Sequence, residues 1–378
     1  MKYVDEFRDS VLAKKIATRI KALINPDRHY AFMEFCGGHT HAISRFGLID
    51  LLPSNVSLIH GPGCPVCVLP IGRVDMAIQV ALEQRVILCT YADVLRVPAS
   101  NGMSLQKAKA RGADVRAVYS PLDALQIALA NPLLEVVFLA IGFETTIPTT
   151  AITLMKAKKL GVRNFSILCN HVLTPTAMQA IFSVKNQSNE DLKVDGIIGP
   201  AHVSIIIGTT PYDSFVKTYS KPVVIAGFEP LDLMQSIQML ITLVNLGRAE
   251  VQNEFTRAVQ REGNLIAKEA IAEVFRVRDS FEWRGLGSIP KSALELNNEY
   301  SEFDGEIRFS LLYKKVRDNK ACECGAILRG EKKPQDCKIF GTICTPENPI
   351  GSCMVSSEGA CAAHYSYGRF RNIPVVVI

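Results

Sequence analysis

Short apolar runs alternate with amphipathic segments from about residue 29 to residue 228. The runs are nearly continuous in hydrophobic residues, which is typical of parallel strands covered on both faces. Apolar residues between them recur at helical spacing. The expected strands are 30–35, 56–60, 86–90, 136–141, 165–169, 196–199 and 222–227, and the expected helices are 73–84, 104–111, 121–130, 149–160 and 174–184. This alternation predicts an α/β fold with parallel sheets.

A weak repeat suggests how the strands are divided. A strand followed by Cys and His, a Gly-Pro turn, and a Gly-Phe-Glu loop occur twice in the same order. The paired segments are 32–43 with 165–177, 58–68 with 197–205, and 140–148 with 225–233. The repeat favours two similar α/β domains that face a cleft. The alternative is that strand-end loops in α/β proteins often look alike.

The pattern changes at both ends of the chain. Residues 1–28 predict an amphipathic N-terminal helix, which we expect to pack on a third domain. We expect the first α/β domain at 29–150 and the second at 151–245. Residues 231–275 are helical in character, residues 276–378 contain few strand runs and many Gly, Pro and Asn residues, and we expect a third domain at 246–378. These patterns predict a mostly irregular and helical third domain, held partly by a cofactor.

Composition and charge narrow the function classes. The formal net charge of +5 over 378 residues is small, and the basic residues form no stripe with aromatic residues, so we expect no nucleic-acid partner. No run of about 18 apolar residues predicts a membrane span. The N-terminus lacks the apolar core of a signal peptide, which makes a cytoplasmic location the expectation. In a reducing cytosol, clustered cysteines indicate metal or redox chemistry.

The C-terminal cysteines carry the strongest chemical signal. Six of the 11 cysteines lie between 322 and 361, and four of them form the pattern C-x12-C-x6-C-x16-C, namely Cys324, Cys337, Cys344 and Cys361. Four thiolates suit an iron–sulfur cluster. Zinc and structural thiols stay open, although the paired C-x2-C knuckles of zinc ribbons are missing here. Cys322 and Cys353 are left over and fit a dithiol beside the cluster.

A second cysteine pair occurs near the N-terminus. Cys64 and Cys67 form a C-x2-C motif directly after one expected strand and before an expected helix. A helix N-terminus lowers the pKa of a thiol, so this is a suitable place for a redox-active dithiol. Half of a zinc site completed elsewhere is the alternative.

A third motif, Cys36 followed by two glycines, His39 and His41, also follows a strand. The open glycine turn would let Cys36 and His39 reach one metal or ligand, or let His39 act on the thiolate. A buried free cysteine with surface histidines is the alternative. By contrast, Cys89 and Cys169 end apolar runs and are expected to be buried small hydrophobes.

Polar residues at other strand ends are weaker candidates, because open α/β folds bind ligands at the carboxyl ends of their strands. The cleft candidates are His41, Asp93, Glu144, Thr145, Thr146, His202 and Glu229. The chain has no Walker A loop and no GxGxxG motif, so an ordinary nucleotide site is not indicated.

Together these motifs resemble the HypD family of hydrogenase maturation proteins. The resemblance runs from the N-terminal helix to near the C-terminus. It rests on CGGHTHAI at 36–43, GPGCPVCVLPIGRVD at 61–75, GFETT at 142–146, HVS with GFEPLDL within 202–233, and the C-terminal cysteine spacing.

The resemblance implies a scaffold on which the Fe(CN)2CO unit of [NiFe]-hydrogenase is assembled with a small HypC-type chaperone. A HypE-type partner would deliver cyanide as a cysteine-bound thiocyanate. Cys36 would be the ligand of the transient iron unit, with His39 beside it, and Cys64 and Cys67 would be the central redox pair.

The resemblance also implies a resident [4Fe-4S] cluster held by Cys324, Cys337, Cys344 and Cys361, with Cys324 preferred over Cys322 on spacing. Some family members resemble ferredoxin–thioredoxin reductase, with a disulfide beside the cluster, and Cys322 and Cys353 could form one. Electrons would then pass from the cluster through Cys322 and Cys353, and through Cys64 and Cys67, to the iron at Cys36. A disulfide reductase acting on a partner protein and a zinc-stabilised scaffold without redox activity are the rival functions.

Overall fold

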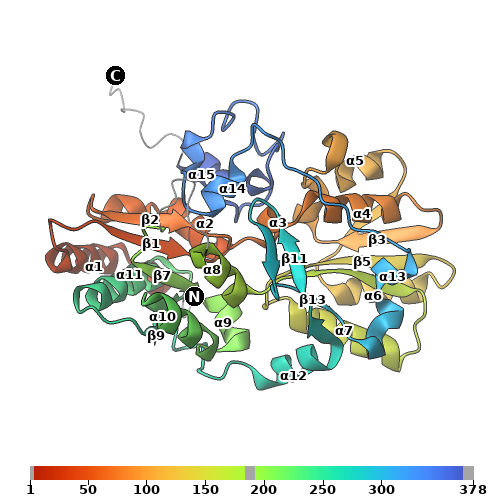
Figure 1. Ribbon diagram of the computed structural model, residues 1–378, viewed down its shortest axis with the longest axis horizontal. Helices are drawn as coiled ribbons and strands as arrows, with labels where there is room; N and C mark the ends of the chain where they lie inside the picture. The colour runs from red at the N-terminus through yellow and green to blue at the C-terminus, as the bar shows by residue number, and fades with distance from the viewer. Residues whose placement is uncertain (1–3, 184–191, 369–378) are drawn as a thin grey trace.

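Two parallel β-sheets lie side by side in the computed structural model, which describes residues 4–183 and 192–368 (Figure 1). Sheet A has the order β2 (Val56–His60), β1 (Tyr30–Glu34), β7 (Gly196–Pro200), β8 (Val223–Ala226) and β9 (Val251–Asn253). Sheet B has the order β4 (Asp114–Ala117), β3 (Val86–Thr90), β5 (Glu135–Gly142) and β6 (Phe165–His171). The predicted pair of similar α/β domains is therefore confirmed.

The two sheets share one topology but are not contiguous in sequence. In each, the first strand lies between the second and the third, so β1, β2, β7 and β8 correspond to β3, β4, β5 and β6. The expected boundary at residue 150 does not separate the sheets, because β6 pairs with β5, whereas β1 and β2 join β7. The chain enters sheet B after β2 and returns to sheet A after β6.

The weak repeat therefore does not reflect the equivalence of the sheets. Its segments pair β1 with β6, β2 with β7, and β5 with β8, which are not topological counterparts. The repeated segments look alike because several of these strand ends line the same cavity and are followed by tight turns. The similarity of strand-end loops was the correct alternative.

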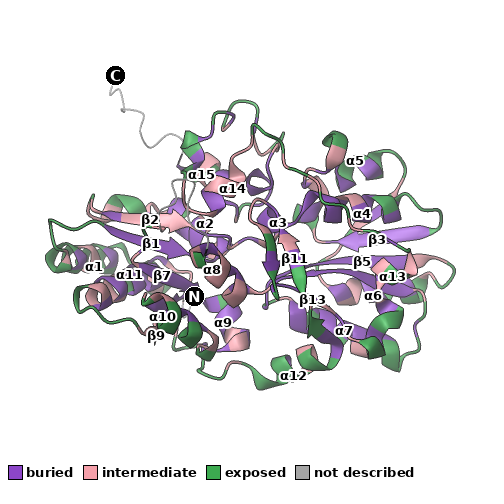
Figure 2. Ribbon diagram, viewed as in Figure 1, coloured by how far each residue is buried: buried purple, intermediate pink, exposed green. Residues whose placement is uncertain are grey.

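Helices cover both faces of each sheet, as the continuous apolar strands require. One face of sheet A packs against α1 (Ser10–Leu23), α2 (Gly37–Phe46) and α11 (Pro230–Asn245), and the other against α8 (Thr174–Ser183), α9 (Ala201–Ile207) and α10 (Asp213–Tyr219). One face of sheet B packs against α6 (Pro121–Ala130) and α7 (Ile147–Lys159), and the other against α4 (Ile71–Ala81) and α5 (Leu105–Ala110). Figure 2 shows the strands β1, β3 and β5 buried and β2 intermediate, with exposed residues on the outer helices.

All seven expected strands and all five expected helices are present, with ends shifted by up to three residues. Residue 184 of the fifth expected helix lies outside the described residues, as do residues 1–3 and 369–378. The apolar runs did not predict β4, β9 or the four short strands between residues 275 and 296. β4 and β9 are edge strands with partly exposed residues and so need no continuous apolar run, whereas the edge strand β6 is buried throughout.

The N-terminal helix packs differently from the expectation. α1 lies against α11 of sheet A, with Ile20 fully buried in their shared core, and not on the third domain. The amphipathic stripe of α1 was read correctly, but such a stripe states only that one face is buried. Its partner depends on which apolar helix face the tertiary fold leaves uncovered.

The rest of the chain forms a largely irregular region, and its first helix packs against α7 of sheet B. It contains α12 (Leu265–Val274) and two antiparallel pairs, β10 (Phe275–Val277) with β13 (Leu294–Leu296) and β11 (Ser280–Trp283) with β12 (Gly287–Pro290). Short helices follow: α13 (Gly305–Arg308), α14 (Cys324–Leu328) and α15 (Ala360–Tyr367). Figure 1 shows α14 and α15 above α2 and α3 (Pro65–Val68), and α15 contacts α2.

Within the described ranges, no helix combines the length and the apolar character that crossing a membrane requires.

Candidate functional site

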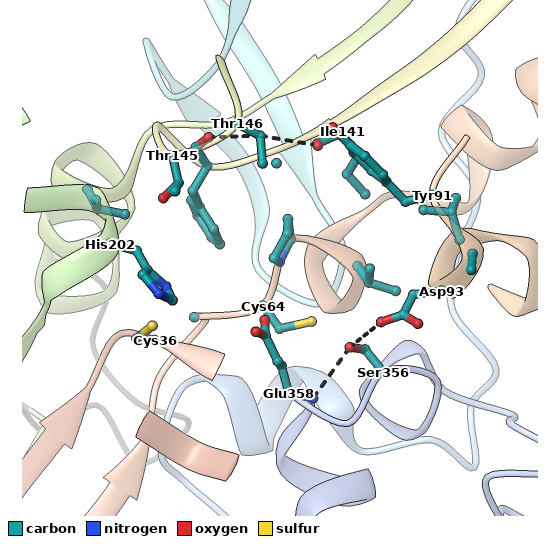
Figure 3. A pocket seen from close by; sticks show the side chains of 18 of the residues that line it. Cys36, Cys64, Tyr91, Asp93, Ile141, Thr145, Thr146, His202, Ser356 and Glu358 are labelled. Carbon is teal, nitrogen blue, oxygen red and sulfur yellow. Dashed lines mark hydrogen bonds between the residues drawn. The ribbon is translucent and has the colours of Figure 1, made fainter. Parts of the chain in front are cut away.

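The carboxyl ends of both sheets line one cavity of about 530 Å³. Sheet A contributes the ends of β1 and β7, and sheet B contributes the ends of β3 and β5. In each sheet these two strands are neighbours whose connections run in opposite directions, which is where open α/β sheets bind ligands. Figure 3 shows Cys36, Cys64 and His202 on one side of this cavity and Tyr91 and Ile141 on the other.

Cys36 stands at the start of α2 with its thiol on the cavity. It is the N-cap of the helix in an extended conformation, and it is 7% exposed. The peptide N–H of Gly37 donates to the carbonyl of Gly63, at 3.0 Å, which joins this turn to the Cys64 loop. A Cβ on Gly63 would lie only 2.6 Å from the Cys36 carbonyl carbon, so the close approach requires glycine.

The Cys36 thiol is electrostatically disfavoured as a free thiolate. Burial raises its pKa most strongly, and the carboxylates of Glu358 and Glu34 raise it further. A thiolate at this position therefore needs a cation or an electrophile beside it.

His39 does not line the cavity. Its ring is fully buried, its Nε2 lies 3.0 Å from the carbonyl oxygen of Ala226, and burial lowers its pKa to about 4. Phe228 lies between His39 and His202, with ring centroids 5.1 Å and 3.8 Å away. The imidazole that reaches the cavity is therefore that of His202, and any action of His39 on Cys36 stays a prediction.

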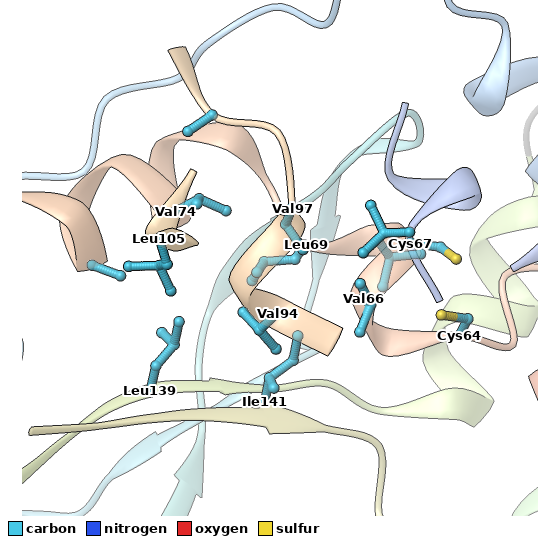
Figure 4. Packing of buried hydrophobic residues seen from close by; sticks show 14 of the residues in the cluster. Cys64, Val66, Cys67, Leu69, Val74, Val94, Val97, Leu105, Leu139 and Ile141 are labelled. Atoms are coloured by element: carbon cyan, nitrogen blue, oxygen red, sulfur yellow. The ribbon is translucent and has the colours of Figure 1, made fainter. Parts of the chain in front are cut away.

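Cys64 is the N-cap of the single turn α3, and Cys67 lies within that turn, between the cavity and the C-terminal region. Cys64 lines the cavity, whereas Cys67 is buried behind it among apolar residues such as Val66 and Leu69 (Figure 4). The expected lowering of the thiol pKa is wrong for Cys67. Burial and hydrogen bonds with Cys353 and Cys64 raise its pKa well above the ordinary value, and these effects outweigh one short helix turn.

Cys353 connects this pair to the C-terminal cysteines. Its fully buried thiol is hydrogen-bonded with Cys67, Cys324 and Cys361, and these contacts lower its pKa. Cys322 is instead hydrogen-bonded with Cys324. All of these cysteines are free thiols. The structure thus places Cys353 beside Cys67, and the expected pairing of Cys322 with Cys353 is not the contact formed.

The cysteine thiols of the C-terminal region are the type of ligand that an iron–sulfur cluster needs. Cys324 and Cys361 are in contact, Cys344 is close enough to Cys324 for the two thiols to interact electrostatically, and Cys337 is buried in the same apolar cluster. Among the described residues, no three or more His, Cys, Asp or Glu side chains are arranged as a metal site. The thiols therefore offer suitable ligands without a preformed ligand geometry.

The weaker cleft candidates divide into two groups. Asp93, Thr145, Thr146 and His202 line the cavity. Glu144 is buried and accepts hydrogen bonds from the backbone and hydroxyl of Thr174, at 2.8 and 2.9 Å. Glu229 caps α11 and pairs with Arg8, and the His41 Nε2 lies 3.2 Å from the Tyr367 hydroxyl.

Several cavity residues were not anticipated. Glu358 and Ser356 enter from the loop before α15, and Ser356 donates to Asp93 at 2.8 Å. Tyr91 and Phe143 add an aromatic wall from sheet B. For Tyr91 and Phe143, the one feature of the local sequence that indicates a place in the cavity is that each directly follows a strand. Nothing local distinguishes Glu358, which becomes part of the site only when the C-terminal region folds over the sheets.

Comparison of the sequence with known proteins identifies one family. The family model HypD, described as "Hydrogenase formation hypA family", matches residues 11–368. The hydrogenase maturation factor HypD of Cupriavidus necator is 63% identical over the full length of both chains. The Azotobacter chroococcum hydrogenase expression/formation protein HupD is 60% identical over both full lengths, and HypD of Escherichia coli K12 is 46% identical over 97% of this chain and 98% of its own. The chain therefore belongs to the HypD family.

Proposed function

We propose that this chain is a hydrogenase maturation factor that serves as the scaffold for assembling an Fe(CN)2CO unit. The iron is cargo, and Cys36 is its ligand from this chain. The observation that carries the proposal is the position of Cys36 in the cavity, with Cys64 in the same wall and a continuous group of thiols behind it.

The cavity provides what an iron–thiolate unit needs. Burial and two carboxylates make a free thiolate at Cys36 unfavourable, so binding of a cation stabilises the deprotonated thiol. The sheet B wall of Tyr91, Ile141 and Phe143 is largely apolar and limits water around small ligands such as cyanide and carbon monoxide.

The dithiol of Cys64 and Cys67 supplies two electrons for cyanide transfer. Two thiols and one protein-bound thiocyanate yield one disulfide, one free partner thiol and one hydrogen cyanide, whose carbon is captured by the iron as the proton leaves. The sulfur–carbon bond of the thiocyanate breaks and the sulfur–sulfur bond of the pair forms. The hydrogen-bonding contact of Cys67 with Cys64 favours this closure.

Resetting the dithiol falls to the C-terminal region. Cys324, Cys337, Cys344 and Cys361 would hold a [4Fe-4S] cluster, which supplies single electrons when bound. Cys353 lies against Cys67 on one side and against Cys324 and Cys361 on the other. We therefore assign Cys353, rather than a Cys322–Cys353 pair, as the thiol next to the central dithiol.

The proposal includes two protein partners in the cytoplasm. A HypC-type chaperone would supply another ligand to the iron at Cys36, and a HypE-type protein would present the thiocyanate. Both would have to reach the cavity between the sheets, whose rim includes the fully exposed Tyr119.

The test is anaerobic purification with the HypC-type partner, followed by metal and sulfide analysis and infrared spectroscopy. Cys36→Ala should lose the CN and CO bands while it keeps the visible absorption of the cluster. Cys89→Ala, which removes a buried thiol inside sheet B, is the matched control and should keep both. Bands that survive in Cys36→Ala would contradict the assignment, and zinc without iron would contradict the redox scaffold.

A further inference from the structure

A fully buried carboxylate lies directly beneath the Cys36 turn. Glu34 is the last residue of β1, and its side chain has no exposed surface. Its carboxylate accepts three hydrogen bonds, from the Cys36 backbone N–H at 2.9 Å, the Thr40 hydroxyl, and Nδ1 of His60 at 2.9 Å. A buried carboxyl group that is hydrogen-bonded on several sides is held in one position, because losing any one donor leaves one of its oxygens unsatisfied.

These three donors come from α2 with its N-cap and from β2. Cys36 precedes α2, Thr40 lies in the first turn of α2, and His60 ends β2, where it is the cross-strand neighbour of Glu34. The main-chain carbonyl of Glu34 also accepts from Gly61 at 2.9 Å. One residue thus holds the turn that bears Cys36 against the loop that leads to Cys64.

We propose that Glu34, with His60 as its outer partner, is the positioning residue that sets the direction of the Cys36 thiol toward the cavity. It acts through the backbone of Cys36 and needs no contact with the reacting atoms. The inference rests on the proposed role of Cys36 in cargo binding. It adds to that role the reason why one thiol is presented in a fixed orientation before the cargo arrives.

Sheet B provides a matched comparison. Glu144 is also a buried carboxylate at a strand end, but its hydrogen bonds tie the β5 loop to Thr174 and it does not line the cavity. A purely structural contribution of buried carboxylates would make Glu34 and Glu144 equivalent. A positioning role makes only Glu34 specific for Cys36.

The experiment measures alkylation of the metal-free full chain by iodoacetamide under anaerobic conditions. Peptide mass spectrometry gives the rate at Cys36 relative to that at Cys64, which lines the same cavity. Glu34→Leu should raise this ratio at least about fivefold, because the freed turn exposes its thiol when the buried hydrogen bonds are lost. Glu34→Gln keeps an acceptor for the Cys36 N–H but removes the carboxylate that raises the pKa of Cys36, so its ratio measures the electrostatic effect alone, and the ratio in Glu34→Leu should exceed it clearly.

Glu144→Leu is the control and should leave the ratio unchanged, even if it lowers the unfolding midpoint. An unchanged ratio in folded Glu34→Leu, or an equal rise in Glu144→Leu, overturns the proposal. If Glu34→Leu does not fold, His60 decides the outcome. His60→Leu should raise the ratio about twofold or more, and His60→Asn, whose amide can donate from the Nδ1 position, should restore it; failure of either result overturns the proposal.

The measurement uses no iron and no partner. It can therefore succeed when Cys36→Ala keeps its iron bands, or fail when those bands are lost. The positioning role and the proposed function can be rejected separately.

Discussion

The two sheets share one topology, yet they present different chemistry to the cavity. After β1, sheet A places Cys36, two glycines and the buried Glu34 network. After the corresponding strand β3, sheet B places Tyr91 and Asp93, and its next strand adds Phe143. One half thus places a buried cysteine thiol on the cavity and the other forms a mostly apolar wall. The common topology of the two sheets determines where the strand ends meet. The residues that follow each strand determine which side chains line the cavity.

Replacing Gly63 tests the closest packing on the sheet A side and carries the largest expected effect. In Gly63→Ala the new Cβ meets the Cys36 backbone, which cannot move without breaking the turn, so the free energy of unfolding should fall by at least about 3 kcal/mol. Urea denaturation measures the change. Gly161→Ala is the control, since its Cβ meets open space and only its positive φ adds strain, about 1 kcal/mol. Equal losses would contradict the packing argument.

Glu144 gives sheet B a pH dependence. Burial raises its pKa from the ordinary 4.5 to about 7, so the folded state holds its proton more tightly than the unfolded state. The stability from this group is present below about pH 4.5 and is lost as pH rises through 7. That loss should be roughly 2 to 3 kcal/mol. Glu144→Gln should remove it, as shown by urea unfolding at about pH 5 and about pH 7.5. Parallel profiles for both proteins would refute the prediction.

The Phe228 ring lies between the fully buried His39 and His202, which lines the cavity. Phe228→Leu should lower the free energy of unfolding by about 1 kcal/mol and broaden the NMR signals of His202, because the stacked contact is lost. Phe228→Tyr keeps the ring and serves as the control. Unchanged His202 signals in the leucine variant would show that the ring does not orient the imidazole.

The ion pair of the N-terminal segment should contribute least to the stability of the fold. Arg8 pairs with Glu229 at the surface, where water screens the pair and the arginine is 42% exposed. Arg8→Ala should therefore leave the thermal unfolding midpoint unchanged within error, and Arg8→Lys should match it. A clear drop in midpoint would mean that this segment stabilises sheet A more than its exposure indicates.

Local sequence was sufficient to predict most strands of the two sheets, because parallel strands covered on both faces must be apolar on both faces. In β1, for example, Tyr30 and Phe32 enter one core while Met33 enters the other. The same reasoning placed Cys36 and Cys64 at strand ends. It could not predict the burial of Glu34, because an acidic residue at the end of an apolar strand is typical of the surface. Only the tertiary fold supplies the hydrogen-bond donors that allow its burial.

The sequence by itself determined the seven covered strands, the amphipathic helices, the glycine turns and the grouping of cysteines. These features depend on hydrophobic periodicity and on residue type, both of which can be read from residues close together in the chain. Only the tertiary structure decided that β1 and β2 join β7, that α1 packs on α11, that Cys353 lies against Cys67, and that Glu358 reaches the cavity. These contacts join segments far apart in the chain, and their partners are selected by the packing of whole layers.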